Sequence, residues 1–408
     1  MDDSTNSERQ EWQQQGDLVV QKFTYLISKW DEDDEEPLPT LPRNHPMSAE
    51  LIQSKRALLQ RLCTSLLPLL RTKIEHLEQS LDPTELRKAP ASQLKLILDI
   101  QSEVDRTLDQ IDSAQEEICQ GACSPTQSDD SDMEELKSYR LYVLKSSIKA
   151  TLMSLICESF RKHVDLIQQL NLSTETFQGE PDIYAAKKQV EEYTSYVYEE
   201  IDSTINLPRV SDFANMKNLW TDVIPAIDLA LQDILRLIKE TEKRPVVCPN
   251  YTPNDPSIPV LIQVIPIVKL SRLFFNKLSC PPLDEGILVR FSDLPSSRME
   301  ALGEIPHKFL RLLADVCALL KHSSVGRADI TVRRLNVLVE SLDSSFDRCF
   351  NVADYFINQI LDTLGSSIQN YLKTWFANWY TSFELAISNL MKAVESYEYK
   401  LCECSDCL

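Results

Sequence analysis

The sequence predicts an all-α protein made of elongated antiparallel helical bundles, with no β-sheet. The chain has 408 residues, 43% hydrophobic and 25% charged, which is typical of a globular protein that can bury one large core or two smaller ones. It contains only 7 Gly, where average usage would give about 29. Hairpin turns and phosphate-binding loops therefore lack the residue they need most. Apolar residues recur at steps of three and four, and no run alternates long enough to indicate a strand.

Residues 1–46 are predicted to hold one helix followed by a linker. Apolar residues between Leu18 and Trp30 share one face of a helix, which ends at the acidic run Asp31 to Glu36. The next residues read Pro-Leu-Pro-Thr-Leu-Pro. Repeated Pro prevents a helix and favours an extended chain, so we expect a linker here.

Residues 47–244 are predicted to form the first bundle. Five amphipathic segments follow one another, each separated from the next by Pro, Gly or a polar stretch. Helices are expected from near Ser48 to Leu81 with a kink at Pro68, from a cap at Ser92 to Ile118, from Leu141 to Leu170, from Ile183 to Ile205, and from a cap at Ser211 or Asp212 to Ile238.

Residues 121–132 interrupt this bundle with a predicted mobile acidic loop. The segment has no apolar periodicity and is rich in Ser and Asp. Ser124 precedes Pro125, and Ser128 and Ser131 lie among acidic residues, contexts that suit proline-directed and acidic-directed kinases. We therefore expect a regulatory loop that is phosphorylated at Ser124, Ser128 or Ser131; an unmodified solvated loop is the alternative.

A Pro-rich connection at residues 245–259 is predicted to separate the first bundle from a second, residues 260–400. The clearest pattern in the chain predicts two long helices, 327–364 and 366–400, that pair as an antiparallel hairpin around Gly365. Aromatic residues between Tyr371 and Phe383 cover more than one face of the last helix. We assign most of them to the core and some to another helix layer or a partner.

Charge and segment length exclude several classes of function. A formal net charge of -20 disfavours nucleic-acid binding and adhesion to anionic membranes. The N-terminal residues resemble no signal peptide, and the apolar segment Ile258 to Val268 is too short to span a bilayer, so no transmembrane segment is expected. The odd number of 11 Cys, mostly scattered singly, does not form a disulfide framework. These features predict a cytoplasmic or nuclear protein.

No catalytic signature and no cofactor or metal site is predicted. The acidic runs Asp31 to Glu36 and Asp129 to Asp132 lie in linker sequence, where carboxylates do not converge on an ion. The five His have no nearby nucleophile. The tail 401–408 carries three thiols that are weak metal candidates and that we expect to be exposed and oxidisable, with acylation or metal binding as alternatives: Cys402, Cys404 and Cys407.

The helix order resembles that of the cyclin-D-interacting family, whose members are vinculin-like helical proteins. The segment Trp220 to Lys239, with Ile224, Ile227 and Leu231, and the helix Ile258 to Leu278 carry the resemblance. The N-terminal helix and the Cys-rich end depart from the family pattern. The resemblance implies a non-enzymatic role in binding partners, in the nucleus or the cytoplasm, with cell-cycle or transcription regulation as the process.

Two hypotheses of function follow. The first is a scaffold or interaction protein that binds protein partners through helix faces. The alternative is an all-helical enzyme whose site is assembled from distant residues. A polar site enclosed by converging carboxylates or a His would favour the enzyme, whereas a continuous apolar surface would favour the scaffold. The oligomeric state and the identity of the partner do not follow from the sequence.

Overall fold

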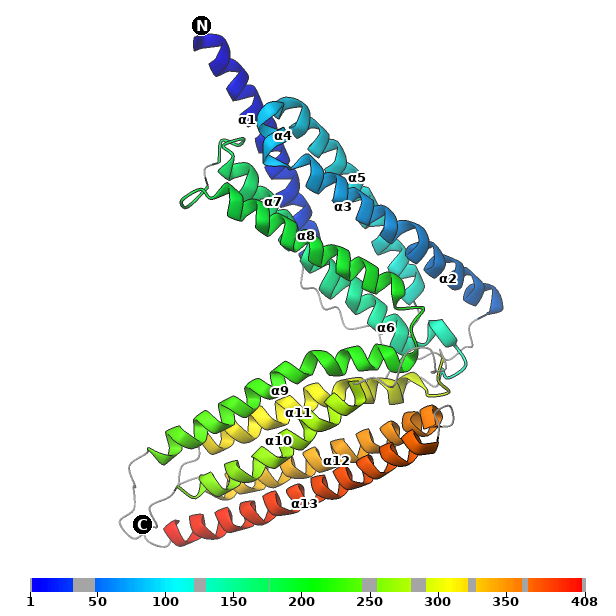
Figure 1. Ribbon diagram of the computed structural model, residues 1–408, viewed down its shortest axis with the longest axis vertical. Helices are drawn as coiled ribbons and strands as arrows, with labels where there is room; N and C mark the ends of the chain where they lie inside the picture. The colour runs from blue at the N-terminus through cyan, green and yellow to red at the C-terminus, as the bar shows by residue number, and fades with distance from the viewer. Residues whose placement is uncertain are drawn as a thin grey trace. The chain divides into compact units, whose positions relative to one another are not determined.

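The computed structural model describes residues 2–31, 48–120, 130–175, 177–243, 255–279, 291–321, 328–361 and 366–405. Within these ranges every regular element is helical, which confirms the all-α class (Figure 1). The α-helices are α1 (Asp2–Trp30), α2 (Ala49–Arg61), α3 (Leu67–Ser80), α4 (Pro83–Lys88), α5 (Pro90–Cys119), α6 (Ser138–Ser146), α7 (Met153–Gln169), α8 (Ile183–Asn206), α9 (Asp212–Glu242), α10 (Ser257–Ser279), α11 (Ser296–Lys321), α12 (Ala328–Leu361) and α13 (Ser366–Ser405).

The chain divides into two compact units, Met1–Arg209 and Val210–Leu408. The predicted boundary in the Pro-rich stretch 245–259 is therefore wrong. Helix α9, which we expected in the first bundle, packs along α10 and α11 in the second unit. The Pro-rich stretch thus connects two neighbouring helices of one unit, and the division between units falls at the short turn that follows α8.

Helix α1 belongs to the first bundle and is not a separate N-terminal region as predicted. It packs against α5 and α7. The ammonium groups of Lys22 and Lys29 bind the two carboxylate oxygens of Asp105 on α5, at 2.7 and 2.8 Å. On its other side, the buried ring of Phe23 lies 5.3 Å from that of Phe160 on α7. Charge and apolar packing together hold α1 in place.

The turn after α7 supplies the other attachment of α1. With few Gly in the chain, Asn171 takes the left-handed conformation (φ 56°), and the amide of Leu172 donates to the carbonyl of Ile167, as in a Schellman cap. The Leu172 carbonyl then faces Gly16 so closely that a side chain at Gly16 would collide with it. The next residue of α1, Asp17, accepts hydrogen bonds from the residues that follow this turn.

Pro68 changes the local geometry where the sequence predicts a kink. Residues Leu62–Leu66 form a π-helical turn between α2 and α3, in which the amide of Leu67 donates to the carbonyl of Leu62. Pro68 has no N–H for the carbonyl four residues before it, and its ring crowds the preceding turn. A wider turn relieves both problems. A second π-helical turn, Ser147–Leu152, lies between α6 and α7.

Two of the predicted helix starts are confirmed by their caps. The hydroxyl oxygen of Ser48 accepts from the amide of Leu51, and that of Ser211 accepts from the amide of Ala214. The predicted cap at Ser92 is wrong, because α5 begins two residues earlier, at Pro90. Pro at the first position of a helix needs no N–H donor and has the right φ already, so it sets the start.

The helices of the second unit pack in a closed circuit of neighbours. Helix α10 lies between α9 and α13, and α11 and α12 complete the circuit from α9 back to α13. The predicted hairpin of the last two helices is confirmed by the contacts of α12 with α13; Gly365 lies outside the described residues. At the centre, the ring of Phe346 on α12 lies 4.4 Å from Phe383 on α13 and 6.2 Å from Phe274 on α10.

Replacing Leu342 tests this hairpin. Leu342 on α12 is 1% exposed, so Leu342→Asp buries an unpaired carboxylate and should lower the free energy of unfolding by several kcal/mol, roughly 3–5. Val337 on the same helix is 61% exposed, and Val337→Asp should cost less than about 1 kcal/mol. Urea unfolding of both variants makes the comparison, and equal unfolding midpoints would contradict the assignment of Leu342 to the core.

Candidate functional site

The predicted cysteine and serine sites fall mostly outside the part of the chain whose side chains the structure describes. Helix α13 includes Cys402 and Cys404 and ends at Ser405, but the side chains of these residues are not described. Cys407 lies beyond the described residues. Ser124 and Ser128 are also outside them. Ser131 is described and is half-buried in a turn. The regulatory and metal-binding hypotheses for these residues stay predictions.

The prediction of a mobile loop over residues 121–132 is wrong for its last residues. Asp130 is buried, and its carboxylate accepts a hydrogen bond from the amide of Ser138 at the start of α6, at 2.6 Å. A carboxylate is stabilised at this end of a helix by the unpaired amides. On the other side of the loop, the buried ammonium of Lys55 donates to the carbonyls of Ile118 and Gln120 at the end of α5. Gln120 and Asp130, which flank residues 121–129, are thus each held by a hydrogen bond.

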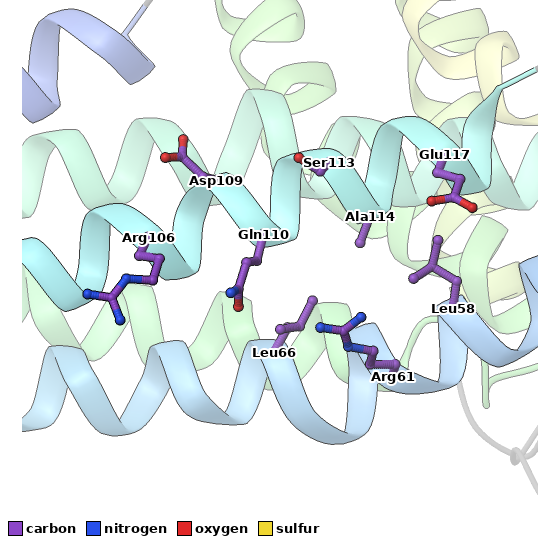
Figure 2. Close-up of a pocket in the computed structure, with 9 residues that line it drawn as sticks. All are labelled: Leu58, Arg61, Leu66, Arg106, Asp109, Gln110, Ser113, Ala114 and Glu117. Atoms are coloured by element: carbon purple, nitrogen blue, oxygen red, sulfur yellow. The ribbon is translucent and has the colours of Figure 1, made fainter.

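A depression of about 290 Å³ lies between the α2–α3 segment and α5 (Figure 2). Arg61 points into it from the α2 side and Gln110 from α5, as Figure 2 shows. Arg106, Asp109 and Glu117 line the same depression, which also has apolar walls from Leu58 and Leu66. This lining contains no His and no Cys, and its cationic and acidic side chains are mixed along one rim. It has the features of an open surface hollow and lacks those of a catalytic pocket.

The buried His and Cys side chains of the first unit lie in surroundings that suit a structural role. The imidazole of His163 on α7 is fully buried and stacks on Phe23, with ring centroids 5.4 Å apart. Burial lowers its pKa to about 3, and neither ring nitrogen has a hydrogen-bond partner. Burial raises the pKa of the Cys63 thiol to about 11 and that of Cys157 to about 12. Thiols with raised pKa values are poor nucleophiles.

Among the described residues, no three or more His, Cys, Asp or Glu side chains are grouped as metal ligands would be. Glu304 and His307 on α11 have the Glu-x-x-His spacing that occurs in di-iron helical bundles, and both side chains are exposed. One turn earlier on the same helix, burial and the nearby Glu304 carboxylate raise the pKa of the Glu300 carboxyl to about 7.

Helix α10 is the element whose surface is unusual. Its 23 residues include no Asp or Glu and make it long and apolar enough to cross a membrane by length and composition, although half of its most apolar window is buried in the second unit. The helix therefore extends well past the segment Ile258 to Val268 that we judged too short to span a bilayer. A buried core helix passes the same test.

One side of α10 remains uncovered by its neighbours. Pro259, Ile262, Pro266, Lys269 and Leu273, which we call the α10 face, are all exposed and follow the three- and four-residue steps of one helical stripe. Ile262 is 46% exposed and Leu273 is 51% exposed. Four of these five side chains are apolar. Exposed apolar residues are common singly, but a continuous helical stripe of them indicates a binding surface.

Basic and aromatic side chains border the α10 face on the side of α13. The ammonium of Lys277 lies 4.6 Å from the ring centroid of Tyr371 and 5.6 Å from that of Trp375. It also donates to the hydroxyl of Tyr371 at 3.3 Å. On the opposite side, the guanidinium of Arg272 binds both carboxylate oxygens of Asp228 on α9, at 2.6 and 3.0 Å. These contacts fix the two edges of the exposed stripe.

The aromatic residues of α13 divide between core and surface. Phe376, Trp379 and Phe383 are buried, and the indole N–H of Trp379 donates to the carbonyl of Leu270 at 2.8 Å. Tyr371 is 58% exposed. The sequence shows that the aromatic residues cover more than one face, but it does not identify α10 as the neighbour. The lack of Asp and Glu in α10 is the signal that could have revealed this surface.

Two family models match the chain, one in each unit. Residues 55–209 match a model described as a domain of unknown function (DUF8723), and residues 211–392 match a second one (DUF8721). The boundary between the matches agrees with the division of the structure. No curated protein and no solved structure matches the chain. The resemblance to the cyclin-D-interacting family stays a prediction that these comparisons do not test.

The pH dependence of stability tests the burial of His163. Its pKa is near 6.5 in the unfolded chain and about 3 in the folded one, so the unfolded state binds more protons between these values and stability falls as the pH falls below about 6.5. At pH 5 the loss amounts to ~2 kcal/mol. His163→Leu should remove that loss.

Urea unfolding at pH 7.5 and pH 5 measures the effect of His163→Leu, with His76→Leu at an exposed position of α3 as the control. The control should keep the pH dependence of the unsubstituted protein. If His163→Leu keeps it as well, the imidazole is protonated in the folded state and the assignment is wrong.

Proposed function

We propose that the chain is a non-enzymatic helical-bundle protein that binds protein partners through the α10 face. The observation that carries this proposal is the exposed stripe of Pro259, Ile262, Pro266 and Leu273 on a helix whose opposite side is packed into the core of the second unit. A helix in a groove, or a helix against a helix, covers such a stripe in many complexes.

The energy of covering the stripe supports a binding role. Complete burial of an Ile or Leu side chain stabilises by ~1.5–3 kcal/mol. Ile262 and Leu273 are each about half exposed, so covering the pair contributes roughly 1.5–3 kcal/mol. Pro259 and Pro266 add rigid apolar surface that loses little conformational entropy on binding. These contributions suit a compact hot spot surrounded by weaker contacts.

The remaining surface is consistent with a soluble scaffold. The net charge of -20 keeps copies of the chain apart by mutual repulsion. We place this role in the cytoplasm or nucleus, in cell-cycle or transcription regulation, as the sequence predicts. The enzyme alternative gains no support from the described residues, because no His and no Cys line the hollow between α2 and α5.

Charged substitutions on the α10 face test the proposal. The double variant Ile262→Glu with Leu273→Glu should lose at least tenfold of the proteins that co-purify with the chain from native extract, because two carboxylates prevent an apolar partner from closing on the stripe. Its thermal unfolding midpoint should stay close to that of the unsubstituted chain, since both positions face solvent.

A matched control carries the same substitutions at exposed apolar positions elsewhere. Leu96→Glu with Val337→Glu changes α5 and α12, whose side chains at these positions are 45% and 61% exposed. This control should keep the co-purifying proteins. Equal recovery with both double variants would show that the α10 face is not a binding surface.

A further inference from the structure

We infer that the partner segment of the α10 face is an acidic amphipathic helix, an inference that rests on the proposed function and specifies the chemistry of its partner. The argument uses three features of the surface: the distribution of charge, the spacing of the apolar side chains, and the contacts that leave two lysines available.

The charge of α10 and of the first half of α13 is opposite in sign to the net charge of the chain. Of 408 residues, 62 are Asp or Glu, yet none occurs in residues 257–279 or 366–383. These two segments contain α10 and the first half of α13, which pack side by side in antiparallel directions. In a strongly acidic protein, these two neighbouring segments therefore carry only basic charges of their own. Such local reversal of sign attracts an oppositely charged partner and raises its association rate.

The cations of this surface differ in availability. Arg272 is neutralised by Asp228, to which it makes two contacts. Lys269 is exposed within the stripe. Lys277 lies over the rings of Tyr371 and Trp375, which partly desolvate its ammonium without cancelling its charge. Two positive charges, eight residues apart on one side of α10, therefore remain to meet carboxylates.

The apolar side chains have the spacing that a partner helix fits. Ile262, Pro266 and Leu273 follow one another along α10 at intervals of four and seven residues, that is at i, i+4 and i+11. A helix whose apolar residues recur at steps of three and four can pack along them. Carboxylates flanking that apolar row then lie within reach of Lys269 and Lys277. An acidic amphipathic helix satisfies both requirements at once.

Other occupants fit the charges less well. A second copy related by a two-fold axis would bring the same Lys269 and Lys277 of both copies to one interface, which costs energy by repulsion. An anionic membrane would attract these lysines, but it would repel the chain as a whole, whose net charge is -20. Each of these occupants is an outcome that the following experiment distinguishes.

Site-specific photo-cross-linking identifies the occupant directly. A benzophenone amino acid replaces Ile262 in the full-length chain, and the control chain carries it at Val337, an exposed position of α12. Both chains are irradiated in native extract, and the cross-linked peptides are sequenced by mass spectrometry. We expect a product specific to position 262, with a net-acidic peptide whose apolar residues recur at three- and four-residue steps.

The dependence on charge is measured on the same product. Lys269→Glu should lower the cross-linking yield at least fivefold, whereas Lys188→Glu, an exposed position on α8, should leave it unchanged. The yield with the chain that retains Lys269 should also fall as the salt concentration rises from about 0.05 to 0.5 M, because salt screens the attraction between the charges.

Each outcome distinguishes the inference from the function on which it rests. An acidic, amphipathic cross-linked peptide that responds to Lys269→Glu supports both. A neutral or basic peptide, or a peptide of this same chain, overturns the inference and leaves partner binding through α10 intact. Cross-links equal at positions 262 and 337, or cross-links to lipid only, overturn the proposed function as well.

Discussion

The composition of α10 constrains the second unit more than any other feature. A helix without acidic residues and with apolar side chains on all sides is stable in water only where neighbours cover it. Helices α9 and α13 cover its two flanks, and the aromatic cluster around Phe274 fills the space beneath it. The last side has no neighbour among the described residues, so the unit buries about half of the most apolar window of this helix and leaves one stripe exposed.

The contacts between helices differ in kind between the two units. In the first, charged side chains link neighbouring helices. Lys22 and Lys29 of α1 form ion pairs with Asp105 of α5, and Lys55 of α2 donates a hydrogen bond to the C-terminal end of α5. In the second, large aromatic rings do most of the packing, as the close contacts of Phe346 show. Aromatic rings bury large apolar areas and pair in tilted or edge-to-face arrangements.

Helical periodicity was sufficient to predict the class of fold and the pairing of the last two helices. It was insufficient for the boundary between units, because a Pro-rich connection such as 245–259 ends a helix without deciding whether the next helix returns along it. Helix α10 does return along α9. The burial of Asp130 was also missed, since composition shows a run of acidic residues but not the amide of Ser138 that binds one of them.

The candidate site could be predicted only in part from the sequence. The absence of acidic residues from 257–279 can be read directly from the sequence and indicates an unusual helix. Which residues of that helix face solvent depends on where α9 and α13 lie, and no local pattern specifies this for a helix that is apolar all round. Lys277 could be identified as an edge residue only once its contacts with Tyr371 and Trp375 were known.

The most direct measurement of the central claim is hydroxyl-radical footprinting of the chain in its native complexes and after purification. Oxidation of Ile262 and Leu273, both about half exposed in the isolated chain, should fall several-fold in the complexes, while that of Val337 stays the same. Equal oxidation of Ile262 and Leu273 in both states would contradict the account, because the α10 face would then stay uncovered when the protein is assembled with its partners.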